Sequence, residues 1–149
     1  MVVKDDLTVP TFTVDTKYLP DGRYRLKLSA SDEKANMKGK GFKVEKELDD
    51  LVTVDKSPPE ISDLKASFSE EETVVECTVN DAYSKITEGF FRVNDGEWEK
   101  LYPVDTLFDE NTEQFRLKLG REEAERGDVV ILRFEDERLN YVLQRVVVE

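Results

Sequence analysis

One stretch of the sequence decides the predicted fold: Phe90-Phe91-Arg92-Val93-Asn94-Asp95-Gly96-Glu97-Trp98-Glu99-Lys100-Leu101-Tyr102. It predicts a β-hairpin closed on Asp95-Gly96, because this dipeptide suits the positive-φ positions of a type I′ turn. The turn sets the register, and a slip of a single residue would move every side chain to the other face. The predicted cross-strand pairs are Val93–Trp98, Arg92–Glu99 and Phe91–Lys100.

Trp98 is the only tryptophan, and the predicted register places it on the same face as Phe91 and Val93. A small β domain needs large buried aromatic rings, so we expect Trp98 to pack in the core. The alternative is an aromatic platform for a sugar, which Trp98 would form with Tyr83 and Tyr102.

Length and charge limit the possible partners. The chain has 149 residues, a net charge of −12 and a pI near 4.6. The length suits one domain, or one domain and part of another. The negative charge argues against nucleic acid and anionic membranes as partners, because a phosphate backbone needs a basic patch to replace its counterions. Solubility explains the charge, and divalent cations or a basic partner are the alternative.

Missing residue types limit the chemistry. Without histidine, the chain lacks the usual general base and the commonest transition-metal ligand. Cys77 is the only cysteine and lies in an alternating segment, so we expect a buried thiol and neither a disulfide nor a thiolate zinc site. The chain has no apolar run long enough to span a membrane and does not open on a signal peptide. We therefore expect no enzyme activity, no cofactor and no membrane insertion.

Two consecutive prolines divide the chain. Lys56-Ser57-Pro58-Pro59 predicts an extended linker, since Pro58 and Pro59 stiffen the backbone and cannot join a central strand. The first unit is then residues 1–56. The second is residues 57–149, close to the roughly 100 residues of an immunoglobulin-type sandwich. In the first unit a turn containing Gly22 precedes the clearest strand, and its predicted strands are 8–15, 23–31, 42–45 and 51–55.

The second unit has short alternating segments separated by turn signals, which is typical of an all-β sandwich. Its predicted strands are 61–68, 73–80, 89–94, 97–102, 114–119, 128–135 and 141–148. Residues 121–127 favour helix but are too few for more than one turn.

A loop of the first unit recurs near the end of the chain. Residues 32–36 and 136–140 both read Asp-x-x-x-Asn between two predicted strands, where Asp and Asn side chains can hold a turn by bonding the backbone. Residues 1–56 therefore look like the last strands of a sandwich whose first strands are missing. Those strands come either from upstream in a parent chain or from a second copy, which would form a homodimer through the incomplete domain.

Two sets of motifs resemble tandem bacterial Ig-like or fibronectin type III-like repeats. The first set resembles a junction between repeats and comprises Leu19-Pro20-Asp21-Gly22-Arg23-Tyr24, Ser29-Ala30-Ser31-Asp32 and Val54-Asp55-Lys56-Ser57-Pro58-Pro59-Glu60-Ile61. The second is similar to the terminal repeat behind β-propeller regions of large bacterial proteins and comprises residues 91–98 and Pro103-Val104-Asp105. The chain departs from the family by lacking a glycine-rich turn before Asn140 and by having Asp128 in the sixth strand.

The resemblance implies an all-β, Ig/fibronectin-like antiparallel sandwich preceded by a partial copy, with a tyrosine corner at Tyr24. It also implies a non-catalytic spacer or protein-interaction module of a larger bacterial protein. The expected location is extracytoplasmic: secreted, periplasmic or at the cell surface. The expected partners are a protein or other domains of the parent chain. The alternative function is a carbohydrate- or calcium-binding accessory module.

Several acidic loops offer oxygen ligands of the kind that calcium takes, although none has EF-hand spacing. Solvated turns are the alternative explanation. The candidate ligands are Asp32, Asp81, Asp136 and Asn140. Neighbouring carboxylates such as Asp109 and Glu110 suggest a glycosidase, but chance accounts for such pairs in a chain with 34 acidic residues.

Overall fold

The computed structural model describes residues 11 and 13–149, and its contacts divide the chain into Met1–Val54 and Asp55–Glu149. The described part is all-β and antiparallel, as the sequence predicts. It contains no helix with the length and apolar character needed to cross a membrane. The division lies close to the predicted boundary after residue 56.

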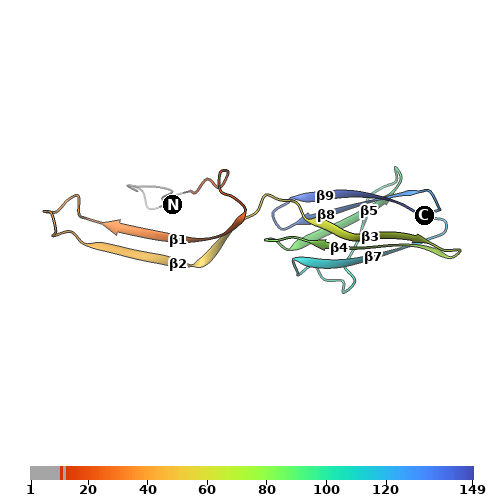
Figure 1. The fold of residues 1–149 in the computed structure, drawn as a ribbon, viewed down its shortest axis with the longest axis horizontal. Coiled ribbons are helices and arrows are strands. Elements are labelled where there is room, and N and C mark those ends of the chain that lie inside the picture. Colours follow the sequence, from red (N-terminus) through yellow and green to blue (C-terminus); the bar gives the residue numbers. More distant parts are fainter. Residues whose placement is uncertain (1–10, 12) are drawn as a thin grey trace. The chain divides into compact units, whose positions relative to one another are not determined.

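The described part of the first unit contains one hairpin, formed by β1 (Gly22–Ser31) and β2 (Lys43–Val54) (Figure 1). Gly22 opens β1 opposite Val54. The sequence predicted two short strands around an acidic bend, whereas β2 continues through residues 48–50 and absorbs them as a register shift. The predicted strand at 8–15 is not formed at residues 11 and 13–15, and its other residues lie outside the described part of the chain.

The two faces of this hairpin differ in chemistry. One face is charged, and Lys27 Nζ lies 2.6 Å from a Glu45 carboxylate oxygen across the strands. The register places Tyr24 opposite Val52 and Ala30 opposite Val44 on the other face. We call this second face the hairpin apolar face; by register and alternation its side chains are Tyr24, Leu26, Leu28, Ala30, Val44, Lys46, Leu48, Asp50, Val52 and Val54.

The turn before β1 is held by a tyrosine. The Tyr24 hydroxyl donates a hydrogen bond of 2.6 Å to the carbonyl oxygen of Pro20, four residues upstream. This is the kind of bond that a tyrosine corner makes.

The second unit is built from two antiparallel sheets (Figure 1). One has the order β3-β4-β7 and the other β6-β5-β8-β9. The strands are β3 (Glu60–Phe68), β4 (Glu72–Asn80), β5 (Ile86–Val93), β6 (Glu99–Lys100), β7 (Thr112–Gly120), β8 (Val129–Asp136) and β9 (Tyr141–Val147). Residues 121–127 do not form a helix, but the Ala124 amide donates to the Gly120 carbonyl at 3.2 Å, which is the hydrogen bond of a single helical turn.

The two sheets bury one apolar core between them, because alternate residues of each strand point inward. Val79 on β4 and Leu132 on β8 are fully buried in it. The aromatic rings of Phe115 on β7 and Phe134 on β8 meet across the sheets with centroids 4.4 Å apart. The core therefore requires both sheets.

The register predicted for the central hairpin is wrong by one residue. Phe91 pairs with Glu99, and Phe90 pairs with Lys100. The chain reverses after Val93, whose carbonyl accepts a hydrogen bond of 2.9 Å from the Gly96 amide, so the turn is centred on Asn94 and Asp95. The predicted type I′ turn on Asp95-Gly96 is absent, since the positive φ of +51° belongs to Asn94.

A contact with a distant strand explains this difference. The Asn94 side chain donates to the Asp128 carboxylate at 2.9 Å and accepts from the Val129 amide at 3.0 Å. Asn94 is thereby tied to the start of β8, and β5 pairs with β8 from Ile86 to Val93. The pairing of β5 with β6 is correspondingly short.

The prediction that Trp98 packs in the core is also wrong. Trp98 is 42% exposed, and the Arg92 guanidinium lies 5.0 Å from the centre of its ring. Phe91 is buried and Val93 packs against the core, so Trp98 lies apart from both, with Arg92 on the outer side of the sheet. The register shift moves the tryptophan out of the predicted face.

The two linker prolines have different environments. Neither belongs to a strand, as predicted, and Pro58 is exposed. Pro59 is fully buried, so it belongs to the body of the second unit.

Gly89 is the position where the core tolerates no side chain. A Cβ atom at Gly89 would lie 2.6 Å from the Leu101 carbonyl oxygen and 3.2 Å from the Phe115 ring.

Gly89→Ala should therefore lower the free energy of unfolding by about 1–3 kcal/mol, measured by urea denaturation. Gly120→Ala is the control, since its Cβ would meet only the end of the Glu123 side chain; equal loss in both variants would contradict the prediction.

Candidate functional site

Three aspartates meet at the end of the second unit where β4 and β8 stop and the chain leads into β3. Asp55 precedes β3, Asp81 follows β4, and Asp136 is the last residue of β8. One carboxylate oxygen from each lies within 4.8 Å of the other two. The residues are 8%, 5% and 0% exposed, respectively. We call Asp55, Asp81 and Asp136 the carboxylate cluster.

The backbone orients two of these carboxylates. One oxygen of Asp81 accepts hydrogen bonds of 2.8 Å from the amides of Tyr83 and Ser84. One oxygen of Asp136 accepts from the amides of Arg138 and Asn140, at 2.7 and 3.0 Å. Each of these two carboxylates accepts hydrogen bonds from amides two to four residues further along the chain. The local turns therefore fix the position of each carboxylate.

Neutral side chains connect the cluster. The Ser84 hydroxyl donates to one carboxylate oxygen of Asp55. The Asn140 amide nitrogen donates to the second oxygen of Asp136 at 2.9 Å and reaches the Asp55 carbonyl at 3.5 Å. The loop that carries Asn140 also holds Leu139 at φ +66°, a conformation that costs energy for a residue with a side chain. Leu139 has this conformation in the turn before Asn140, where the resemblance of the sequence motifs predicts a glycine-rich turn.

The electrostatics of the cluster are unfavourable for three negative charges. Among the residues that the structure describes, no lysine or arginine forms an ion pair with any of the three. Burial raises the pKa of Asp81 above its usual 3.8, and the charges of Asp55 and Asp136 raise it further, against the two amide bonds that lower it. The arrangement suits a cation or a shared proton.

The cluster is open to solvent on one side. A hollow of about 210 Å³ lies beside it and includes Asp55 and Asp81 among its lining residues, together with Asn80 and Tyr83. Carboxylates from three separate chain segments, two of which line a hollow with room for water, are a donor set that Ca²⁺ takes. Water would have to supply the remaining ligands, since Ca²⁺ takes roughly six to eight oxygens.

The structure brings together three of the four residues predicted as calcium ligands: Asp81, Asp136 and Asn140. Asp32 lies in the other unit, where it is exposed and its carboxylate accepts a hydrogen bond from the Phe42 amide. Sequence reasoning missed Asp55. Its signal was the position directly after an apolar strand and before Pro58, but only the fold shows that this position meets Asp81.

The other sequence candidates do not form sites. No ring contact within the described residues joins Trp98 to Tyr83 or Tyr102, and Tyr102 instead meets Phe108 at 6.0 Å. Asp109 and Glu110 are exposed, and their amides donate to the buried Glu113 carboxylate. They form a capped loop, not a pocket with paired carboxylates.

Cys77 lies inside the core on β4 and is 6% exposed. Burial raises the pKa of its thiol to about 12, so it stays protonated at neutral pH. A protonated, buried thiol is a poor nucleophile and a poor metal ligand.

Comparison with known proteins adds no family. No family model, no curated protein and no solved structure matches the chain.

The carboxylate cluster should make stability depend on pH. A carboxyl whose pKa is raised on folding destabilises the folded chain as pH rises above the unfolded value of 3.8. Asp81→Asn keeps an oxygen for the amides of Tyr83 and Ser84 but removes the charge. In chelator at pH 7 it should raise the melting temperature by a few degrees, and the gain should shrink towards pH 4. A gain of equal size at pH 4 would contradict this assignment; Asp109→Asn, in an exposed loop, is the control.

Proposed function

We propose that the chain is a non-catalytic structural and protein-interaction module of a larger bacterial protein, located outside the cytoplasm. Its second unit would be an Ig/fibronectin type III-like sandwich. The strand order supports this assignment, because β4 lies beside β7 and β5 beside β8, as Greek-key connections require. The family resemblance of the sequence motifs supports the location.

The first unit would be a partial copy of the same domain. β1 and β2 are joined by a loop in which the Asn36 side chain donates to the Asp32 carbonyl at 3.0 Å. In the loop between β8 and β9, Asn140 donates to the Asp136 carboxylate. The Tyr24 hydroxyl bond adds a device known from sandwich domains.

The observation that carries the interaction role is the hairpin apolar face. Leu28 is 52% exposed and Val44 58% exposed, although both lie on the apolar side of a regular hairpin. A two-stranded hairpin by itself is marginally stable in water and needs further strands or a covering layer. The face therefore supports a binding role for this unit.

A second copy of the chain is the proposed occupant. Two identical apolar faces can pack on each other around a twofold axis, so that each surface is complementary to itself. The opposite face carries charged cross-strand pairs such as Arg25–Glu47 and suits water. The result would be a homodimer through the incomplete domain.

Light scattering across a range of concentrations tests this proposal. The mass should rise from the 17.2 kDa of one chain towards twice that value. Leu28→Glu should keep the chain monomeric, because it would bury an unpaired charge in the interface. Ser31→Glu is the matched control: it adds the same charge opposite Lys43 on the other face. A wild-type monomer at every concentration would reject the homodimer and favour covering strands from a parent chain.

Calcium binding is the second candidate function, and the carboxylate cluster is the observation that favours it. Bound Ca²⁺ would replace the repulsion among Asp55, Asp81 and Asp136 by coordination and would stabilise only the folded chain.

A melting experiment with Ca²⁺ and with chelator tests the second candidate. At about 100 times the dissociation constant, a ligand stabilises by about 2.7 kcal/mol, which for a domain of this size is on the order of 10 °C. Asp136→Asn should abolish the rise, and Asp32→Asn should retain it. If Mg²⁺ and Ca²⁺ both leave the wild-type midpoint unchanged, the cluster is a structural turn network.

A further inference from the structure

The outer face of the β6-β5-β8-β9 sheet carries the opposite charge to the rest of its unit. Residues 55–149 hold 24 of the 34 acidic and 12 of the 22 basic residues, so the entire net charge lies in this unit. On this face, however, the outward positions carry four cations and two acids. They are Arg92, Lys100, Arg133 and Arg145, with Glu88 and Glu135.

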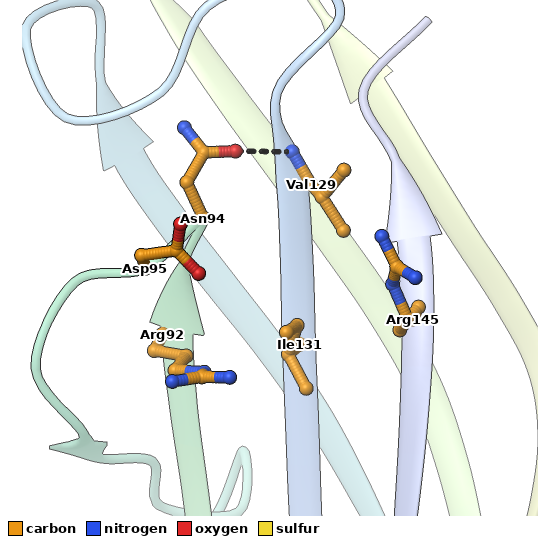
Figure 2. Close-up of a pocket in the computed structure, with 6 residues that line it drawn as sticks. All are labelled: Arg92, Asn94, Asp95, Val129, Ile131 and Arg145. Carbon is orange, nitrogen blue, oxygen red and sulfur yellow. Dashed lines mark hydrogen bonds between the residues drawn. The ribbon is translucent and has the colours of Figure 1, made fainter.

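Cationic and apolar side chains alternate across the strands. Arg92 pairs with Ile131, and Ile131 pairs with Arg145, so the three side chains form one row on the same side of the sheet. The next row is Lys100, Phe90, Arg133 and Leu143. Figure 2 shows Arg92 and Arg145 on either side of Ile131, in an open hollow of about 460 Å³ whose rim includes Asn94 and Asp95.

Two of the four cations lack an acidic partner. Lys100 is paired with Glu88, and Arg133 is 2.7 Å from Glu135. Arg92 and Arg145 form neither an ion pair nor a side-chain hydrogen bond within the described part of the chain. An arginine presents its hydrogen-bond donors in a planar arrangement that suits carboxylates. The guanidinium groups of Arg92 and Arg145 therefore have donors that can bind carboxylates of a partner.

We propose that this face binds an acidic segment of a partner protein. Arg92 and Arg145 would bind two of its carboxylates, and Ile131 would contact an apolar side chain between them. The Cα atoms of Arg92 and Arg145 are two strands apart, about 10 Å. Carboxylates four residues apart in an extended segment lie about 13 Å apart, and the side chain midway between them points to the same face. Long arginine side chains can bridge this difference.

The chemistry of the face favours protein over carbohydrate. A sugar needs an exposed aromatic ring, but a cation lies over each ring here, as Arg92 does over Trp98 at 5.0 Å and Arg133 over Tyr141 at 4.9 Å. The exposed apolar groups that have no cation over them are aliphatic, with Leu143 and Val147 each 51% exposed. Aliphatic side chains between cations match an extended segment in which acidic and apolar residues alternate along one face, that is, at every second position.

The outer face of the other sheet serves as an internal comparison. There two of the three cations are paired across the strands, Arg116 with Glu76 at 3.2 Å and Lys118 with Glu72 at 3.4 Å, and the third, Lys65, lies opposite Glu76 in the strand register. The excess of unpaired cations thus belongs to the four-stranded sheet. The proposal does not depend on the hairpin apolar face, and its test uses the full chain carrying Leu28→Glu.

The probe is a labelled, extended peptide of about nine residues in which every second position is alternately glutamate and valine, with serine at the positions between, titrated by fluorescence anisotropy. Binding should also change the emission of Trp98, the only tryptophan. Arg92→Gln with Arg145→Gln should weaken binding at least about tenfold, since hydrogen bonds to charged groups are worth more than 1.4 kcal/mol. Arg116→Gln on the other sheet is the matched control and should change affinity less than twofold.

Four outcomes would overturn the proposal. The first is no binding of the peptide at millimolar concentration. The second is equal loss of affinity in Arg116→Gln, which would indicate non-specific attraction. The third is binding of polygalacturonate at this face without binding of the peptide, which would assign an acidic polysaccharide. The fourth is self-association of the Leu28→Glu chain that Arg145→Gln abolishes, which would make a second copy the occupant.

Discussion

The contact between Phe115 and Phe134 joins the two sheets, and the rest of the sandwich depends on it. The rings can approach to 4.4 Å because Gly89 presents no side chain where they meet. Leu101 crosses β5 at the same point and donates its amide to the Gly89 carbonyl at 2.8 Å. This close packing fixes β5 against the core, while the hydrogen bonds of Asn94 with Asp128 and Val129 set the pairing of β5 with β8 and leave only a short pairing with β6.

The alternating side chains of strand β8 contribute to the core, to the carboxylate cluster and to the cationic outer face. Its inward residues include Phe134 in the core and Asp136 in the carboxylate cluster. Its outward residues include Ile131 and Arg133 on the cationic face. Because successive side chains point to opposite faces, the acidic cluster and the cationic face are kept apart within one strand.

In both Asp-x-x-x-Asn loops the Asn amide donates back to the Asp, at the Asp32 backbone carbonyl in one and at the Asp136 carboxylate in the other, but their surroundings differ. Asp136 is buried because a second sheet covers the end of its strand, and it meets Asp55 and Asp81 there. Asp32 directly follows β1, in the loop that joins the two strands of the first hairpin. That hairpin has an exposed apolar face, and Asp32 is itself exposed. A local motif therefore becomes a candidate site only when tertiary packing brings other loops to it.

The sequence by itself determined the strands and their faces, because alternation with a period of two is a local property. This holds for β1, β4 and β7, whose predicted ranges match the observed strands closely. It also indicated Asp81, Asp136 and Asn140, since acidic and amide side chains after strands are recognisable one at a time. Only the tertiary structure decided the central register, because the position of Asn94 depends on Asp128 and Val129, 34 and 35 residues later. It also decided that Asp55 joins the cluster and that Arg92 and Arg145 flank Ile131, because both arrangements arise from strand pairings that no local pattern encodes.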